Sequence, residues 1–176
     1  NIESVNHNDL GVNSGNAGAI LGLSALYNID EAESTLDLIN LLANSLTSAI
    51  SKNNSRAMNP EALYSGFAMG TTGISYSLLL ASELLNETRY RNVAEEMIGN
   101  VIGDLKLHEN PVSIIQNNHS MGKLNFETSW CHGASGRGLA LIRAMTILGE
   151  NKFMGELNDE ISKVEKSDIQ FLDQLC

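Results

Sequence analysis

Apolar side chains gather in three segments of the chain, and each segment directly follows a pair of closely spaced glycines. Residues 19–26, 74–80 and 139–145 are apolar around most of a helical circumference and contain few β-branched residues. They lack the alternation of apolar and polar positions that marks a half-buried strand. The pattern therefore predicts three helices that are buried on several sides.

A second kind of segment follows each of these three, with apolar residues mostly three or four positions apart. This spacing places the apolar side chains on one face and predicts an outer, amphipathic helix. Asp30 and Glu33 predict the N-cap and the acidic third residue of the first such helix. The apolar positions are Leu36, Ile39, Leu42, Leu46 and Ile50, then Val93, Met97, Val101 and Leu105, then Phe153, Leu157, Ile161 and Val164.

The glycine pairs mark an internal repeat. Gly-x-x-Gly occurs at residues 15–18, 70–73 and 133–136, at intervals of 55 and 63 residues. Glycine lets the chain turn sharply before a helix, so the first N–H groups of each helix are expected to stay uncovered. Three such turns brought together would border a concave, electropositive-edged site.

The repeat also predicts the architecture. We expect residues 1–176 to form a single partial domain, with repeats near 9–58, 59–115 and 125–176. Each unit can bury its apolar faces only against its neighbours. The prediction is an all-α fold in which the helices form a curved or closed double layer, with apolar edges exposed at its two ends.

The amino-acid composition argues against a nucleic-acid partner and against a membrane span. The chain has 176 residues, of which 43% are hydrophobic, enough for a sizeable core. Its 21 acidic and 11 basic residues give a net charge of -10, and no cluster of Lys and Arg suggests a nucleic-acid partner. No stretch approaches the roughly 18 apolar residues of a membrane span, and the first residues do not resemble a secretory signal. These features predict a cytoplasmic protein without a membrane span.

The strongest chemical feature is Cys131, which stands in the segment SWCHGASG at residues 129–136. The second cysteine of the chain is Cys176. In a reducing compartment such a pair binds a metal or takes part in chemistry more often than it forms a disulfide framework. Thiolate and neutral imidazole are favoured zinc donors, so Cys131 and Cys176 are candidate zinc ligands. The alternatives are a buried structural thiol at Cys131 and a polar lining residue at His132.

On these residues the sequence resembles the lanthionine synthetase C-like cyclases, and most closely the cyclase domain of class II lanthipeptide synthetases. The resemblance rests on SWCHGASG, on the Gly-x-x-Gly helices, and on residues 15–21 and 66–75, and it covers essentially the whole chain. It implies that the chain is part of an α/α toroid, a closed double layer of helices with seven repeats, of which this chain would supply about three. It also implies a zinc ion held by Cys131, by Cys176 and by a histidine that would follow Cys176.

The resemblance further implies an activity for the longer protein, a zinc-dependent lanthionine cyclase. A zinc-bound cysteine thiolate of a dehydrated precursor peptide with its leader would add to a dehydroalanine or dehydrobutyrine of the same peptide and close a thioether ring. Zinc is the implied cofactor, and His132 is a candidate acid/base or a residue that supports the site. With part of its ligand set missing, the chain by itself is expected to be inactive.

Two departures from the family pattern leave a second function open. The family usually has a histidine where this chain has Met69, and methionine cannot transfer a proton. The family also tends to carry an aspartate where this chain has Gly11, and Asp9 is the nearest acidic candidate for that role. The alternative is a non-catalytic helical-toroid module that binds peptide or serves as a scaffold. A glycosidase or prenyl-transfer toroid would need paired carboxylates or Asp-rich ligands, which the sequence does not suggest.

Overall fold

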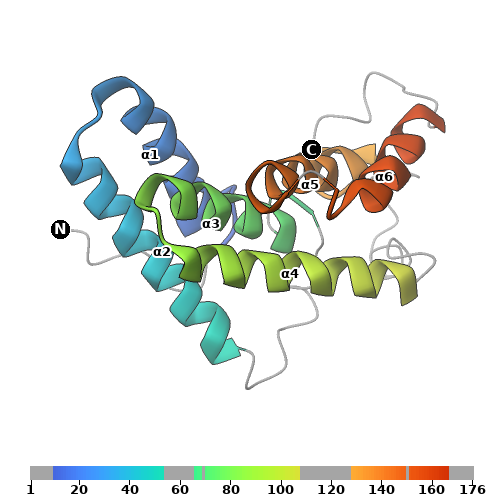
Figure 1. Cartoon of the computed structure of the whole chain (residues 1–176), viewed down its shortest axis with the longest axis horizontal. Helices are drawn as coiled ribbons and strands as arrows, with labels where there is room; N and C mark the ends of the chain where they lie inside the picture. Colours follow the sequence, from blue (N-terminus) through green and yellow to red (C-terminus); the bar gives the residue numbers. More distant parts are fainter. Residues whose placement is uncertain (1–9, 54–65, 69, 108–127, 150, 167–176) are drawn as a thin grey trace, which may run out of the picture.

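The computed structural model describes residues 10–53, 66–68, 70–107, 128–149 and 151–166. Every regular element of this described part is a helix, which confirms the all-α prediction. The helices are α1 (Asn16–Asp30), α2 (Glu33–Asn53), α3 (Thr71–Leu85), α4 (Thr88–Leu107), α5 (Ala134–Leu148) and α6 (Met154–Lys166) (Figure 1).

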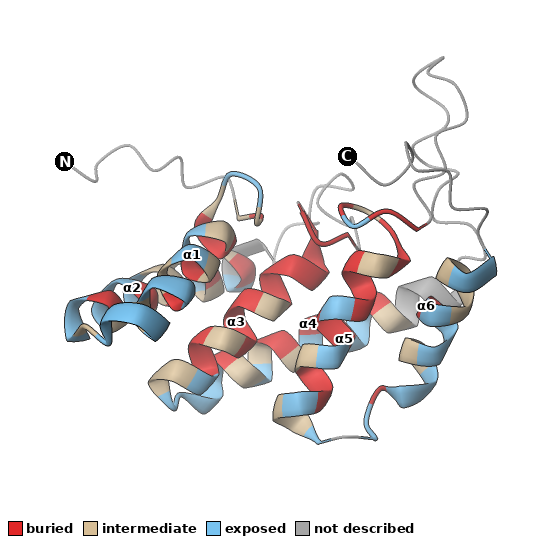
Figure 2. Ribbon diagram, turned by 90° about the horizontal axis from the view of Figure 1, so that it is seen from above, coloured by how far each residue is buried: buried red, intermediate tan, exposed pale blue. Residues whose placement is uncertain are grey.

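The helices alternate between two kinds, as the repeat predicts. Helices α1, α3 and α5 each begin directly after the first glycine of a Gly-x-x-Gly pair. Each of them packs against the helix that follows it, and α3 also packs against both α1 and α5. Helix α3 therefore lies in the middle of the molecule and is buried along most of its length (Figure 2).

We call α1, α3 and α5 the inner helices, and α2, α4 and α6 the outer helices. Unlike α3, the inner helices α1 and α5 are buried on one side only. Leu26 and Ile29 of α1 are 45% and 83% exposed, and Leu139 and Ile142 of α5 are 42% and 52% exposed. The prediction of a helix buried on several sides is therefore confirmed for α3. In α1 and α5 part of the apolar surface faces outward.

The core lies between the inner and outer helices. Its fully buried side chains come from both kinds of helix, since Leu78 and Leu79 of α3 lie in one cluster with Ile39 and Leu46 of α2 and Ile98 of α4. Burying an aliphatic side chain of this size contributes about 1.5–3 kcal/mol relative to leaving it in water. The amphipathic faces predicted for α2 and α4 thus supply one half of the core.

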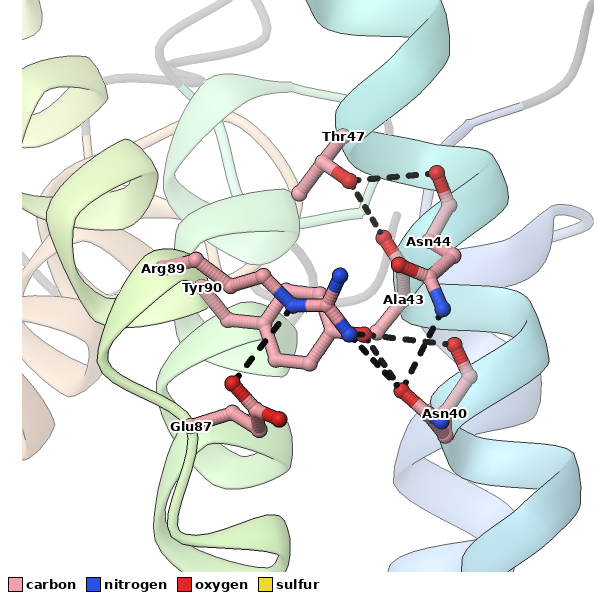
Figure 3. Close-up of polar contacts among 7 residues, drawn as sticks. All are labelled: Asn40, Ala43, Asn44, Thr47, Glu87, Arg89 and Tyr90. Carbon is pink, nitrogen blue, oxygen red and sulfur yellow. Dashed lines mark hydrogen bonds and ion pairs between the residues drawn. The ribbon is translucent and has the colours of Figure 1, made fainter.

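A polar cluster joins α2 and α4 at the edge of this core (Figure 3). Tyr90 is fully buried, and its hydroxyl donates to Oδ1 of Asn40 over 2.6 Å. Arg89 donates to the same Asn40 oxygen over 3.2 Å and to the Tyr90 hydroxyl over 2.8 Å. Burial raises the pKa of Tyr90, an effect that the nearby Arg89 charge partly opposes. The phenol therefore stays protonated and keeps its role as a hydrogen-bond donor.

Two local predictions are wrong. Asp30 is the last residue of α1 and not the N-cap of α2, because Glu31 adopts a left-handed conformation and α2 begins only at Glu33. The Asp30 carboxylate instead accepts the backbone N–H of Ala32 over 3.0 Å. In α6, Ile161 is 45% exposed whereas Glu160 is buried, since Glu160 pairs with an arginine of α5.

No helix within the described ranges is both long and apolar enough to cross a membrane.

Candidate functional site

The three turns that precede the inner helices are joined to one another through their backbones. The N–H of Asn13 donates to the carbonyl oxygen of Ala68 over 2.9 Å, and the N–H of Ala68 donates to the carbonyl oxygen of Cys131 over 3.1 Å. Residues 13, 68 and 131 each stand five positions before the second glycine of their motif. Equivalent positions of the three repeats thus form one hydrogen-bonded row, and Cys131 lies at its end.

The second glycine of each motif lets its turn fold back against the helix. A Cβ atom at Gly136 would overlap the carbonyl oxygen of Trp130, six residues earlier. The same overlap would arise between Gly73 and the Phe67 oxygen, and between Gly18 and the Val12 oxygen. The glycines are therefore required by close backbone packing, and this packing fixes where each turn lies.

Gly66 brings the second turn against the third. A Cβ at Gly66 would overlap the carbonyl oxygen of Cys131 and would lie 2.6 Å from the Cα of His132. Both contacts are with backbone atoms, which cannot move away as the end of a flexible side chain could. The segment that carries Cys131 is thus packed directly on the neighbouring repeat.

The helix starts differ from the sequence prediction in one respect. Gly15 precedes α1 in an extended conformation and provides no side-chain cap. The N–H groups of Ala17 and Gly18 nevertheless donate to the carbonyl oxygens of Leu10 and Gly11, each over 3.3 Å. The expectation of uncovered N–H groups is therefore wrong at α1, where the preceding turn folds back and supplies the acceptors.

Two serines hold the Cys131 turn in shape. Ser129 accepts the His132 N–H at its Oγ over 3.2 Å and the Gly133 N–H at its carbonyl oxygen over 2.8 Å. Ser135 of α5 donates its hydroxyl to the carbonyl oxygen of Thr128 over 2.7 Å. Both ends of the turn are thus attached to the start of α5.

Cys131 itself is buried, with 4% of its surface exposed. The sulfur of Cys131 is in a disulfide bond, so it would have to be reduced before it could bind a metal ion. The side chain is therefore in a protected position at the junction of the second and third turns.

His132 is half-buried beside it. Burial lowers the pKa of its imidazole below the ordinary value, because a charged ring is less well solvated there. The ring is therefore neutral near pH 7, the form in which a histidine can accept a proton or bind a metal.

Aromatic side chains form one wall next to the turn. The ring of Phe67 lies 5.3 Å from that of Trp130 and 5.3 Å from that of Tyr76, measured between ring centroids. Phe67 is buried, while Trp130 is 41% exposed. Trp130 therefore presents apolar surface to the outside within one residue of Cys131.

The sequence analysis did not predict a buried ion pair that lies next to the Cys131 turn. Arg137 of α5 and Glu160 of α6 are 6% and 5% exposed, and Nη2 of Arg137 donates to Oε2 of Glu160 over 2.7 Å. A signal was present in the sequence, because Arg137 interrupts an otherwise uncharged helix start. A buried charge of this kind needs a partner.

Of the two cysteines proposed as zinc ligands, Cys131 is the one that lies within the described residues. Within them no group of three or more His, Cys, Asp and Glu side chains could hold a metal ion. A Cys131 thiolate has the chemistry of a zinc ligand. Cys176, Asp9 and Met69 lie outside the described residues.

Comparisons with known proteins give a consistent result. The family model described as lanthionine synthetase C-like protein matches residues 1–176. The chain is 27% identical over 162 residues to the Lacticin 481/lactococcin biosynthesis protein LcnDR2 of Lactococcus lactis subsp. lactis. That match covers 92% of this chain but only 16% of the relative, so the chain spans about a sixth of the length of the curated relative it matches.

Proposed function

Because this chain belongs to the lanthionine synthetase C-like family, we propose that it is part of the cyclisation centre of a lanthipeptide synthetase. The relative is named for its part in lacticin 481 and lactococcin biosynthesis, which supports a role of this chain in lanthipeptide biosynthesis. The substrate of the longer protein would be a dehydrated precursor peptide with its leader. A cytoplasmic location would keep the cysteines reduced.

The observation that carries the proposal is the position of Cys131. Its backbone accepts the Ala68 N–H, lies against Gly66 and is attached through Ser129 to the start of α5. A ligand held this firmly loses little conformational freedom when it binds a metal ion. Cys131 is therefore well placed as the first zinc ligand, with Cys176 as the proposed second.

The proposed chemistry assigns one role to the metal and others to the protein. Zinc, when bound, would hold the substrate cysteine as a thiolate, which is the nucleophile that adds to a dehydroalanine or dehydrobutyrine. His132 is the candidate for proton transfer, in place of the histidine that Met69 replaces. Trp130 offers an apolar surface on which the peptide could rest beside Cys131.

We further propose that the chain is part of a toroid that continues beyond α1 and α5. Support comes from the outward-facing apolar residues Leu26, Ile29, Leu139 and Ile142, which lie on the two inner helices that flank α3. Neighbouring repeats would cover them as α1 and α5 cover α3. The repeats near 9–58, 59–115 and 125–176 then form one partial domain.

The test is the zinc content of the full-length protein, purified with a reductant, beside its Cys131→Ala variant. We expect about one zinc per chain in the wild type and a large loss in the variant, together with loss of thioether formation on a dehydrated peptide. Ser48→Ala, an exposed change on α2, is the matched control and should keep both. A protein that holds no zinc and closes no ring would instead support the peptide-binding or scaffold role.

A further inference from the structure

The arginine of the buried ion pair between α5 and α6 is also hydrogen-bonded to the turn that carries Cys131. Arg137 donates through Nη2 to Glu160 over 2.7 Å and through Nη1 to the carbonyl oxygen of His132 over 3.1 Å. One guanidinium therefore bridges the Cys131 turn and helix α6. The two serines at the turn attach it to α5 alone, so Arg137 adds a link to a second helix.

The carboxylate of this pair is itself fixed on both sides. Oε1 of Glu160 accepts from Nζ of Lys163 over 2.8 Å, while Oε2 accepts from Arg137. Lys163 is one turn further along α6 and is partly exposed. Glu160 is thus a rigid acceptor, and the position of Arg137 follows from the position of α6.

Stability alone is a poor reason for such a pair. Replacing a buried ion pair by apolar residues of similar volume is often neutral or stabilising, because both charges lose their hydration. Nε of Arg137 is also buried and makes no hydrogen bond to any described residue.

We propose that Arg137 and Glu160 are positioning residues for Cys131: they fix the Cys131–His132 backbone relative to α6. This proposal rests on the proposed zinc function, in which Cys131 is a metal ligand. A turn held in one place on α6 would keep the Cys131 side chain ready for the metal. Neither side chain needs to touch the metal or the substrate.

Arginine is required for this task and lysine is not equivalent. The planar guanidinium presents separate N–H groups to two acceptors in fixed directions, whereas a lysine ammonium is a point charge on a flexible stem. Arg137→Lys therefore keeps the charge opposite Glu160 but loses the bridge to the His132 carbonyl. The double variant Arg137→Met with Glu160→Met removes the pair while filling its space.

The experiment measures Co²⁺ as a spectroscopic stand-in for zinc in the reduced full-length protein. Both variants should weaken Co²⁺ affinity by about 10-fold or more, in the range found for residues that orient metal ligands. The thiolate-to-cobalt absorption should change in shape as well as intensity. Circular dichroism and thermal unfolding show whether each variant is folded, and the apolar pair serves where Arg137→Lys proves unstable.

Arg143→Lys is the matched control. Arg143 is also on α5 and also pairs with a glutamate, Glu83 of α3, but it lies away from the Cys131 turn. This variant should bind Co²⁺ as the wild type does. Wild-type Co²⁺ affinity in the folded Arg137→Lys and apolar-pair variants would overturn the positioning role while leaving the zinc function intact. A wild-type protein that binds neither Co²⁺ nor zinc would overturn both.

Discussion

The backbone N–H of Ala68 donates to the carbonyl oxygen of Cys131 over 3.1 Å, and these two residues hold the same position in successive repeats. The preceding repeat uses the same arrangement, with Asn13 donating to Ala68. In the proposed function the position that carries the first metal ligand is therefore one that the repeat already fixes through the backbone. The side chain at that position differs between the three turns, since it belongs to Asn13, Ala68 and Cys131.

This arrangement makes Gly66 a sensitive position. Gly66→Ala places a methyl group on the Cys131 carbonyl oxygen and against His132, so the two turns must separate. We expect the variant to lower local stability by about 1–3 kcal/mol, as overpacking does, and to weaken zinc binding. Hydrogen exchange of residues 128–136 in the full-length protein measures the first effect, and zinc content measures the second.

Gly22 and Gly99 provide the control for that prediction. A Cβ at either position meets nothing within 4 Å, and both glycines are inside helices. Alanine there should stabilise the helix by about 0.5–1 kcal/mol. If Gly66→Ala behaved as these two do, the close contact between the turns would not exist in solution.

The sequence was sufficient to predict the repeated helices, but it did not predict the polar contacts between them. Gly-x-x-Gly and the apolar periodicity correctly predicted the inner and outer helices, and the resemblance to the lanthionine synthetase C-like family is confirmed. Periodicity placed Ile161 inward, but Glu160 is buried there because Arg137 on another helix needs a carboxylate. Such a pairing depends on how α5 and α6 cross, which spacing along one helix does not specify.

Replacement by glycine should have opposite effects on stability at Glu31, which follows α1, and at Glu33, which begins α2. Glu31 follows α1 with φ 49° and ψ 26°, a left-handed conformation that is unfavourable for a residue with a side chain. Glu31→Gly should therefore raise stability by up to about 1 kcal/mol. Glu33→Gly, two residues later in the first turn of α2, should lower it by about 0.5–1 kcal/mol. Thermal unfolding of both variants should show shifts of opposite sign, and equal shifts would contradict the assigned conformations.

The link between α2 and α4 depends on the Tyr90 hydroxyl. Tyr90→Phe keeps the buried ring and removes the donor to Asn40, so we expect a loss of about 0.5–1.5 kcal/mol. Asn40→Ala should be similarly destabilising, and the double variant should cost less than the sum of the two changes. Hydrogen exchange in α4 provides the measurement. Fully additive effects would show that the two side chains do not interact.

Acid should weaken the contact between α5 and α6. Burial raises the pKa of Glu160, but the hydrogen bonds and charges of Arg137 and Lys163 outweigh it, and the net pKa is lowered. The unfolded chain then binds the proton more readily than the folded one, so the stabilisation is complete above the ordinary carboxyl pKa near 4.5 and is lost as the pH falls through the folded value. The ion pair borders a cavity that is also lined by Glu156 and Asp159 of α6, and the lining residues from α3 and α4 are uncharged. As the pH falls below about 4.5, hydrogen exchange in α6 should become faster in the wild type but much less so in Glu160→Gln. The control variant Glu165→Gln, which changes an exposed residue of α6, should behave as the wild type does. An equal rise in all three would assign the acid sensitivity to other groups.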